Sequence, residues 1–176
     1  SAATAPLAHG AGVKTLFAQI SGDLLLDVLI GALFAVLCYS SLAVVLLVAT
    51  LAGSNVLPAH VAIPLVLGAN LGSGILAILS TWRSDAVARR VPLGNFLFKA
   101  AGVALGITVL PFLAPWLRQL DTNPRDLVVI FHFAFNAALA VVFMHFTPKI
   151  AELTESWLPD KRSNENGAQP RYLDPV

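Results

Sequence analysis

Three residues with hydroxyl groups, Tyr39, Ser40 and Ser41, stand side by side inside an apolar run from Leu24 to Ala52. Each hydroxyl needs a hydrogen-bond partner, because an unpaired polar group in an apolar medium is costly. A single serine usually bonds to the carbonyl of the preceding helical turn. Three adjacent hydroxyls are better explained by a break in the helix, where the next helix can offer backbone N–H groups to an anion.

A second polar constellation is Gly68-Ala69-Asn70-Leu71-Gly72-Ser73, near the centre of the apolar stretch from Val61 to Trp82. The side-chain oxygens of Asn70 and Ser73 are of the type that hard cations prefer, and the glycines permit a helix break or a close approach of backbones. The spacing of Gly68 and Gly72 is also typical of tight helix packing. Spacing alone favours packing, although polar interruptions in consecutive segments also occur where transporters bind ions.

Two later apolar stretches carry further polar residues. His132 and Asn136 are four residues apart and therefore share one helix face, where they can bond to each other or to a neighbouring helix. We expect a structural role for this pair. Lys99 is the one charge between residues 91 and 117, and we expect its long side chain to extend toward lipid headgroups. A direct contact of Lys99 with a bound anion is the second interpretation.

The composition decides the class of protein in which these residues lie. Hydrophobic residues make up 57% of the 176-residue chain and charged residues 12%, whereas soluble proteins have about 25% charged residues. Residues 28 to 82 and 127 to 148 contain no charged side chain. Because about 20 apolar residues cross a bilayer, the chain is predicted to be an all-α integral membrane protein.

The expected membrane architecture is one re-entrant or broken helical hairpin followed by about three transmembrane helices. The hairpin would lie in the run from 24 to 52, which is long for one crossing, although a single crossing stays possible. Turns are predicted at 53 to 58, 83 to 90 and 121 to 124. Residues 1–15 are predicted to be a linker, 16–148 the membrane unit, and 149–176 a polar tail. The three crossing segments would be Val61–Trp82, Val91–Leu117 and Leu127–Phe146.

Basic residues predict the orientation of this multi-pass protein in the cell membrane. If the last three segments each cross once, the loop 83 to 90 and the C-terminal tail share one side, and both are rich in Lys and Arg. Such residues favour the cytoplasmic side. We therefore expect this loop and the tail to face the cytoplasm.

Several functional classes are excluded or disfavoured. A formal net charge of +1 provides no basic face for nucleic acid. The single Cys38 allows no internal disulfide. The sequence has no Gly-x-Ser-x-Gly, no His-Glu-x-x-His and no phosphate-cradling lysine motif, so no catalytic residues are predicted and the chain is not expected to be an enzyme.

Four motifs in a fixed order resemble one repeat of the Na/Pi-cotransporter family, which comprises sodium-dependent phosphate transporters. The family pattern has a Gln-Ser-Ser-Ser-Ala motif, a Gly-Ala-Asn-Ile-Gly-Thr motif, an Ala-Arg-Arg then Asn-x-x-Phe segment, and a His-x-x-Phe-Asn segment. Each motif alone would be weak, whereas the four together are fairly specific over roughly residues 24 to 148. The corresponding segments here are YSSLAVVLLVATLAGSNVLP, AIPLVLGANLGSG, ARRVPLGNFLFKAAG and FHFAFN.

The resemblance implies half of an inverted-repeat transporter whose hairpins form a central site for phosphate and Na⁺. It implies that Ser40 and Ser41, with Tyr39 beside them, contact phosphate, and that Ser40 and Ser41 also contact Na⁺. Na⁺ would organise the site so that inorganic phosphate can bind. The other repeat would come from the same chain or from a homodimer partner within the lipid bilayer. Asn70 and Ser73 would support the sodium ion, and the further supporting residues would be Gly68, Gly72, Asn95, Lys99, His132 and Asn136.

The chain departs from the family pattern in its first two motifs. Tyr39 stands where the family usually has Gln, Leu42 replaces the third Ser, and Ser73-Gly74 replaces the usual Thr-Thr. These departures motivate an alternative hypothesis, a non-transporting membrane module that anchors or regulates a cytoplasmic domain resembling the phosphate regulator PhoU. The segment from Pro170 to Pro175 resembles the junction that leads to such a domain.

Overall fold

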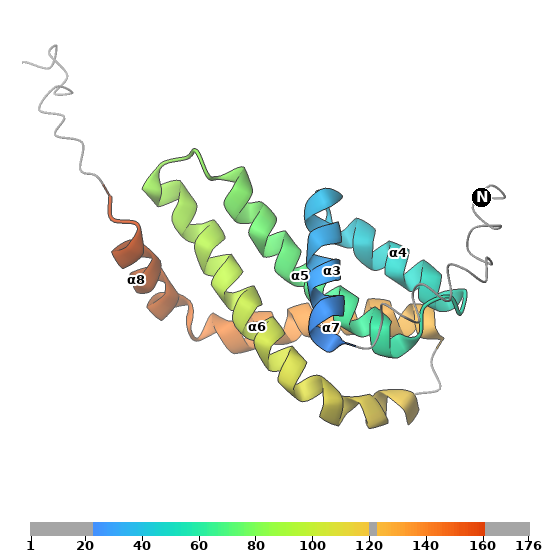
Figure 1. Ribbon diagram of the computed structural model, residues 1–176. Helices are drawn as coiled ribbons and strands as arrows, with labels where there is room; N and C mark the ends of the chain where they lie inside the picture. Colours follow the sequence, from blue (N-terminus) through green and yellow to red (C-terminus); the bar gives the residue numbers. More distant parts are fainter. Residues whose placement is uncertain (1–22, 120–122, 161–176) are drawn as a thin grey trace, which may run out of the picture.

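The computed structural model describes residues 23–119 and 123–160, which form six helices and contain no strand (Figure 1). The all-α prediction is confirmed for these ranges. The predicted linker at 1–15 and the predicted junction at 170–175 lie outside the described residues. In chain order the helices are α3 (Leu24–Leu37), α4 (Ser41–Gly53), α5 (Ala59–Ser80), α6 (Ala86–Gln119), α7 (Pro124–Met144) and α8 (Thr147–Trp157).

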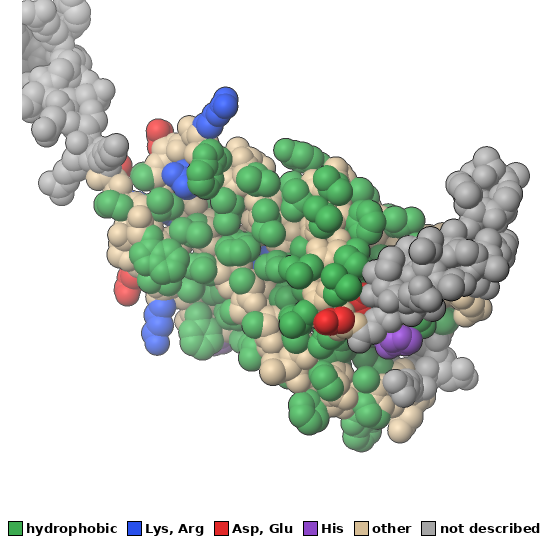
Figure 2. Space-filling view, in the orientation of Figure 1, with side chains coloured by type: hydrophobic (Ala, Val, Ile, Leu, Met, Phe, Trp, Pro, Cys, Tyr) green, Lys and Arg blue, Asp and Glu red, His purple; other side chains and the backbone are tan. Residues whose placement is uncertain are grey.

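Three of these helices, α5, α6 and α7, are long and apolar enough to cross a membrane, as predicted. The central helix is α5. In its most apolar 18-residue stretch 67% is buried inside the protein, against 11% in the corresponding stretches of α6 and α7. Large hydrophobic side chains therefore cover much of the outer surface. Figure 2 shows these side chains over most of one face, with the visible Lys and Arg side chains toward the end that carries α8. Such a surface suits lipid or a further membrane segment.

The apolar run from 24 to 52 forms two short helices that meet at Cys38-Tyr39-Ser40 (Figure 1). Tyr39 has a φ of 52°, a left-handed conformation that ends α3, and Ser40 then caps α4. At 14 and 13 residues, the helices are about 20 Å long, which is less than the ~30 Å hydrocarbon core. Neither helix spans a bilayer alone.

The two helices double back rather than cross once. Leu24, at the start of α3, lines the same cavity as Ala59, at the start of α5, which follows α4 after a short turn. Both ends of the pair therefore lie close together, and the break forms the tip of the pair, where Cys38 and Tyr39 are exposed. This is the geometry of a re-entrant hairpin, which the length of the run suggested.

The hairpin packs on α5 through glycines. A Cβ atom placed on Gly68 would overlap the carbonyl oxygen of Val28, and one on Gly31 would overlap the carbonyl of Leu65. One on Gly72 would lie 2.7 Å from the Cβ of Ala35. Of the two arrangements considered for residues 68 to 74, a helix break and close packing, the structure therefore shows the second, because α5 continues without a break to Ser80.

The loop predicted at 83 to 90 is shorter than expected, because α6 begins at Ala86 rather than Val91. The Arg89 backbone N–H donates to the carbonyl oxygen of Asp85, 3.2 Å away, so Arg89 and Arg90 lie in a helical turn. Hydropathy marks only the apolar part of a helix, and Ala and Arg favour helix outside that part. At 34 residues, α6 bends toward its C-terminal end (Figure 1), where Pro111 and Pro115 interrupt its hydrogen bonding.

The tail begins with a helix that the sequence analysis did not predict. This helix, α8, packs against the start of α6, where Arg90 Nε donates to the carbonyl oxygen of Leu158 at 3.1 Å. Arg90 also lies 3.6 Å from the carboxylate of Glu155. The basic segment at 83 to 90 and the described part of the tail, up to residue 160, thus share one end of the molecule, as the crossing pattern requires. That this end faces the cytoplasm stays a prediction.

Candidate functional site

A polar network joins α5 to α7 inside the helix bundle. Its centre is Asn70, whose surface is only 1% exposed. Asn136 Nδ2 donates to Asn70 Oδ1 at 2.9 Å and to the carbonyl oxygen of His132 at 2.8 Å. Asn70 Nδ2 donates in turn to the carbonyl oxygen of Val66 at 3.0 Å. Residues 62 to 66 positions apart in sequence therefore form one cluster, in which Asn70 is buried and His132 and Asn136 are half-buried.

His132 completes this cluster as an acceptor. Its Nδ1 atom lies 3.3 Å from Asn70 Nδ2 and 3.5 Å from Asn136 Nδ2. Both amide nitrogens are donors, so these contacts assign the proton of a neutral His132 ring to Nε2. The pair at 132 and 136 bonds both internally and to the neighbouring helix, the two possibilities that its spacing allowed.

Lys99 belongs to the same region, which differs from the expectation that it extends toward headgroups. Its Nζ donates to Ser73 Oγ, and Ser73 Oγ donates to the carbonyl oxygen of Asn70 at 2.7 Å. The lysine turns inward because α5 and α6 approach closely here: a Cβ on Gly74 would lie 3.2 Å from the Cα of Phe96. Among the described residues, the ion pair that the structure contains joins Arg90 and Glu155, so no described carboxylate neutralises this ammonium.

The hydroxyl cluster lies at the tip of the hairpin. Ser40 Oγ accepts from the backbone N–H of Ala43 at 3.1 Å and caps α4, whereas Tyr39 is 77% exposed. The half-buried hydroxyl of Ser41 has no hydrogen bond within the described part of the chain. The N-terminus of α4 therefore presents backbone N–H groups and a hydroxyl that is not used for capping, which together can bind an anion.

The hairpin tip and the polar network around Asn70 lie near each other along the bundle but are not in contact. Ala35 packs beside Gly72, and the backbone N–H of Ser40 donates to the carbonyl oxygen of Ala35 at 3.2 Å. No hydrogen bond between described residues joins Tyr39, Ser40 or Ser41 to the network. The structure thus brings together Asn70, Ser73, Lys99, His132 and Asn136 and leaves the hydroxyl cluster as a separate group.

Asn95 lies apart from both groups. It is exposed and lines a groove between α6 and α8, together with Arg90 and Glu155. The sequence grouped Asn95 with the supporting residues through the family motif. The structure instead places it on the side of α6 that faces the tail helix.

The side-chain oxygens of Asn70 and Ser73, which were predicted as sodium ligands, each accept a hydrogen bond in the structure. A sodium ion needs oxygens with lone pairs directed toward it. Asn70 Oδ1 accepts the N–H of Asn136, and Ser73 Oγ accepts the ammonium of Lys99. Ser40 Oγ accepts from the backbone N–H of Ala43, and neither Ser40 nor Ser41 accepts a bond from a charged donor in the described structure.

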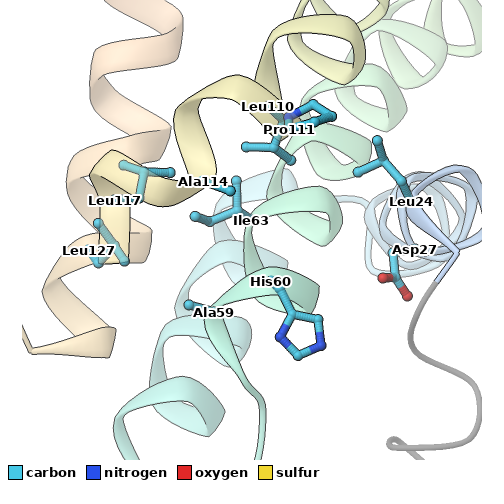
Figure 3. A pocket seen from close by; sticks show the side chains of 10 residues that line it. All are labelled: Leu24, Asp27, Ala59, His60, Ile63, Leu110, Pro111, Ala114, Leu117 and Leu127. Carbon is cyan, nitrogen blue, oxygen red and sulfur yellow. The ribbon is translucent and has the colours of Figure 1, made fainter. Parts of the chain in front are cut away.

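A buried carboxylate that the sequence motifs did not single out lies at the other end of the bundle. Asp27, in the first turn of α3, is 3% exposed and lines a cavity of about 400 Å³ (Figure 3). Figure 3 places His60, from the first turn of α5, on the same side of this otherwise apolar cavity. The signal was available, since Asp27 is the one charged residue in the run from 24 to 52. Asp27 lies in the first turn of α3, at the end of the helix where the backbone dipole favours a negative charge.

Comparison with known proteins agrees with the four motifs. The Na⁺/Pi-cotransporter family matches residues 3–153 of this chain. The chain belongs to this family. This is a transporter family, and the three long apolar helices of the chain are consistent with a membrane protein.

Individual relatives carry names that concern phosphate. The chain is 40% identical over 172 residues to a protein of Escherichia coli K12 named "Putative inorganic phosphate export protein YjbB". It is 39% identical over 175 residues to the protein of the same name from Salmonella typhimurium LT2. Each match covers 98% of this chain and 32% of the relative, so the chain spans about a third of these relatives.

A more distant relative is the uncharacterized protein YqeW of Bacillus subtilis. It is 26% identical over 136 residues, which cover 76% of this chain and 43% of that protein. No solved structure was found to match the chain.

Proposed function

We propose that this chain forms one half of a transport domain that moves inorganic phosphate across the cell membrane. The observation that carries the proposal is the Lys99 ammonium, which is held inside the membrane part of the bundle without a described carboxylate partner. A positive charge in that position favours the entry of an anion. The family and the names of the relatives support phosphate as that anion.

The phosphate-binding group in this proposal is the hairpin tip. Phosphate oxygens need hydrogen-bond donors, and the tip offers the Ser41 hydroxyl and the first backbone N–H groups of α4. Tyr39 stands beside them and restricts access. Lys99 contributes a positive potential or a direct contact, and the buried amide cluster around Asn70 fixes the helix that holds Lys99 in place.

Sodium is the proposed coupling ion, with the oxygens of Ser40 and Ser41 as its ligands. A phosphate anion is expensive to transfer into a low-dielectric site, and a bound Na⁺ lowers that cost by neutralising one charge. The family supports this coupling. The names of the relatives concern export, and we propose the same direction for the protein that contains this chain.

A complete transport domain requires a second hairpin of opposite orientation. We propose that it comes from another repeat of the same protein or from a second copy. The outer face of the hairpin carries exposed side chains, among them Leu29, Leu33 and Leu37, that can pack against such a repeat. During transport, the tips of the two hairpins would then be exposed alternately to the two sides of the membrane.

The test measures radiolabelled phosphate transport by the full-length parent protein in proteoliposomes, with and without a sodium gradient. Ser41→Ala is the informative variant, because it removes a hydroxyl that does not cap α4. A hydrogen bond to a charged group contributes about 1.5–3 kcal/mol, so transport at low phosphate should fall about 10- to 100-fold.

Ser54→Ala is the matched control, since the Ser54 hydroxyl bonds only to the carbonyl oxygen of Thr50 at the other end of α4. If a folded Ser41→Ala protein transported phosphate normally, the hairpin tip would not be part of the phosphate-binding site. A well-folded wild type that transports no phosphate would instead favour the anchoring module.

A further inference from the structure

We propose that Lys99 is a tethered cation that replaces one coupling sodium ion at the segment from Asn70 to Ser73. The transport consequences of this inference rest on the proposed function, whereas the ion-binding consequence does not. Asn70 and Ser73 were expected to bind Na⁺, whereas the structure directs a hydrogen-bond donor at the side-chain oxygen of each.

The hydrogen bonding of Ser73 shows the replacement most directly. Its hydroxyl proton points to the carbonyl oxygen of Asn70 at 2.7 Å, so its lone pairs face away from that carbonyl. A lone pair in that direction is what a cation needs, and Lys99 Nζ occupies it. A protonated lysine carries the same single positive charge as Na⁺.

The lysine is held in this position by the packing of α5 on α6. A Cβ placed on Gly74 would lie 3.5 Å from Lys99 Cδ, so the lysine stem crosses α5 at a residue without a side chain. Gly74 follows Ser73 directly, which sets the ammonium over the serine hydroxyl. The side chain therefore has a defined path to Ser73.

The remaining oxygen of the segment is also occupied by a donor. Asn70 Oδ1 accepts from Asn136, whose amide is itself fixed by the carbonyl oxygen of His132. An ion held by both side-chain oxygens would compete with the ammonium at Ser73 and with the amide at Asn70. The segment is thus complete without Na⁺, because its charge and its hydrogen bonds are supplied by side chains.

A positive charge fixed on the protein changes the coupling between sodium and phosphate transport. It can attract phosphate as a sodium ion would, but it cannot travel with phosphate across the membrane. This half of the transporter would therefore contribute one sodium ion fewer to each transport cycle. Because an inward sodium gradient opposes the outward movement of any ion that travels with Na⁺, a smaller sodium requirement suits export.

The test measures sodium-specific stabilisation of the full-length parent protein in detergent. The thermal unfolding midpoint is recorded while KCl is replaced by NaCl at constant ionic strength, for the wild type and for Lys99→Ser. The serine variant removes the charge and leaves room and an oxygen for an ion. We expect an additional midpoint increase of several degrees in NaCl for Lys99→Ser relative to the wild type.

Three controls sharpen the comparison. Lys99→Met removes the charge but fills the space, and Lys99→Arg keeps the charge, so neither should gain the sodium response. Asn95→Ala changes the same helix one turn away, on the side that faces α8, and should behave as the wild type. If Lys99→Ser does not fold, Lys99→Ala carries the same test, because it also removes the charge and leaves the Ser73 oxygen free for an ion.

An identical sodium response in Lys99→Ser and the wild type would overturn the proposal, as would loss of a wild-type response in that variant. Transport provides the second measurement: the Hill coefficient for Na⁺ should be higher by about one in Lys99→Ser. Since the midpoint measurement needs no transport, a wild type without phosphate transport would contradict the proposed function and leave the ion test intact.

Discussion

A single methyl group at Gly68 should separate the hairpin from α5. In Gly68→Ala, the new Cβ would overlap the carbonyl oxygen of Val28 and would lie 2.8 Å from the backbone nitrogen of Ala32. Both neighbours are backbone atoms of α3, so no side-chain rotation relieves the overlap. Non-bonded atoms need about 3.5 Å, and α3 would have to move away by roughly 1.5 Å.

The expected change in stability has two opposing parts. Alanine is favoured over glycine in a helix by about 1 kcal/mol, which stabilises the variant. Overpacking of a close contact typically costs about 1–3 kcal/mol and more when the backbone must move. Because the overlap here is with backbone, we expect the second part to dominate, with a net loss of about 2 kcal/mol or more.

The assay is thermal unfolding of the full-length protein in detergent, followed by tryptophan fluorescence. Gly106→Ala is the matched control, since its Cβ would lie 3.2 Å from Leu67 Cδ2, the flexible end of a side chain. The midpoint should fall by several degrees for Gly68→Ala and stay within about 2 °C for Gly106→Ala. Equal midpoints for the two variants would refute the close packing of α3 on α5.

Three further substitutions test other contacts. Asn136→Leu removes the donor to buried Asn70 Oδ1, so the protein should lose about 1–3 kcal/mol of unfolding free energy, and an unchanged melting midpoint would contradict the network. Arg90→Ala removes the bonds to Leu158 and Glu155 and should speed amide hydrogen exchange in α8 while changing overall stability by less than about 1 kcal/mol; unaltered exchange would show that α8 is held by other contacts. Asp23→Ala removes the N-cap of α3 and should cost about 1 kcal/mol, whereas Asp23→Ser should restore most of it; equal midpoints for both would argue against capping.

Part of the fold could be predicted from local sequence. Hydropathy located the three crossing helices, because a membrane-spanning segment is a continuous run of mostly apolar residues, which can be recognised from the sequence alone. The position of the hairpin break was predictable for a similar reason, since Tyr39, Ser40 and Ser41 interrupt an apolar run. The start of α6 at Ala86 and the existence of α8 were not, because both lie in polar sequence where hydropathy carries no signal.

The candidate site was predictable in its residues but not in its connections. The motifs singled out Asn70, Ser73, His132 and Asn136, because polar residues in apolar segments are conspicuous. What joins them depends on which helix faces are in contact, and those contacts link positions far apart in the chain. Whether 24 to 52 doubles back was likewise decided by the packing of α3 on α5.

Lys99 shows most clearly what the sequence determined and what only the tertiary structure determined. The sequence determined that one charge lies in a long apolar helix of a membrane protein, since this follows from composition and spacing alone. It favoured an extended side chain, because a lysine near a helix end can reach water. Only the tertiary structure placed Gly74 and Ser73 of α5 beside it, and with them an acceptor for the ammonium inside the bundle. The direction of a long flexible side chain depends on its neighbours in space, which a local pattern does not specify.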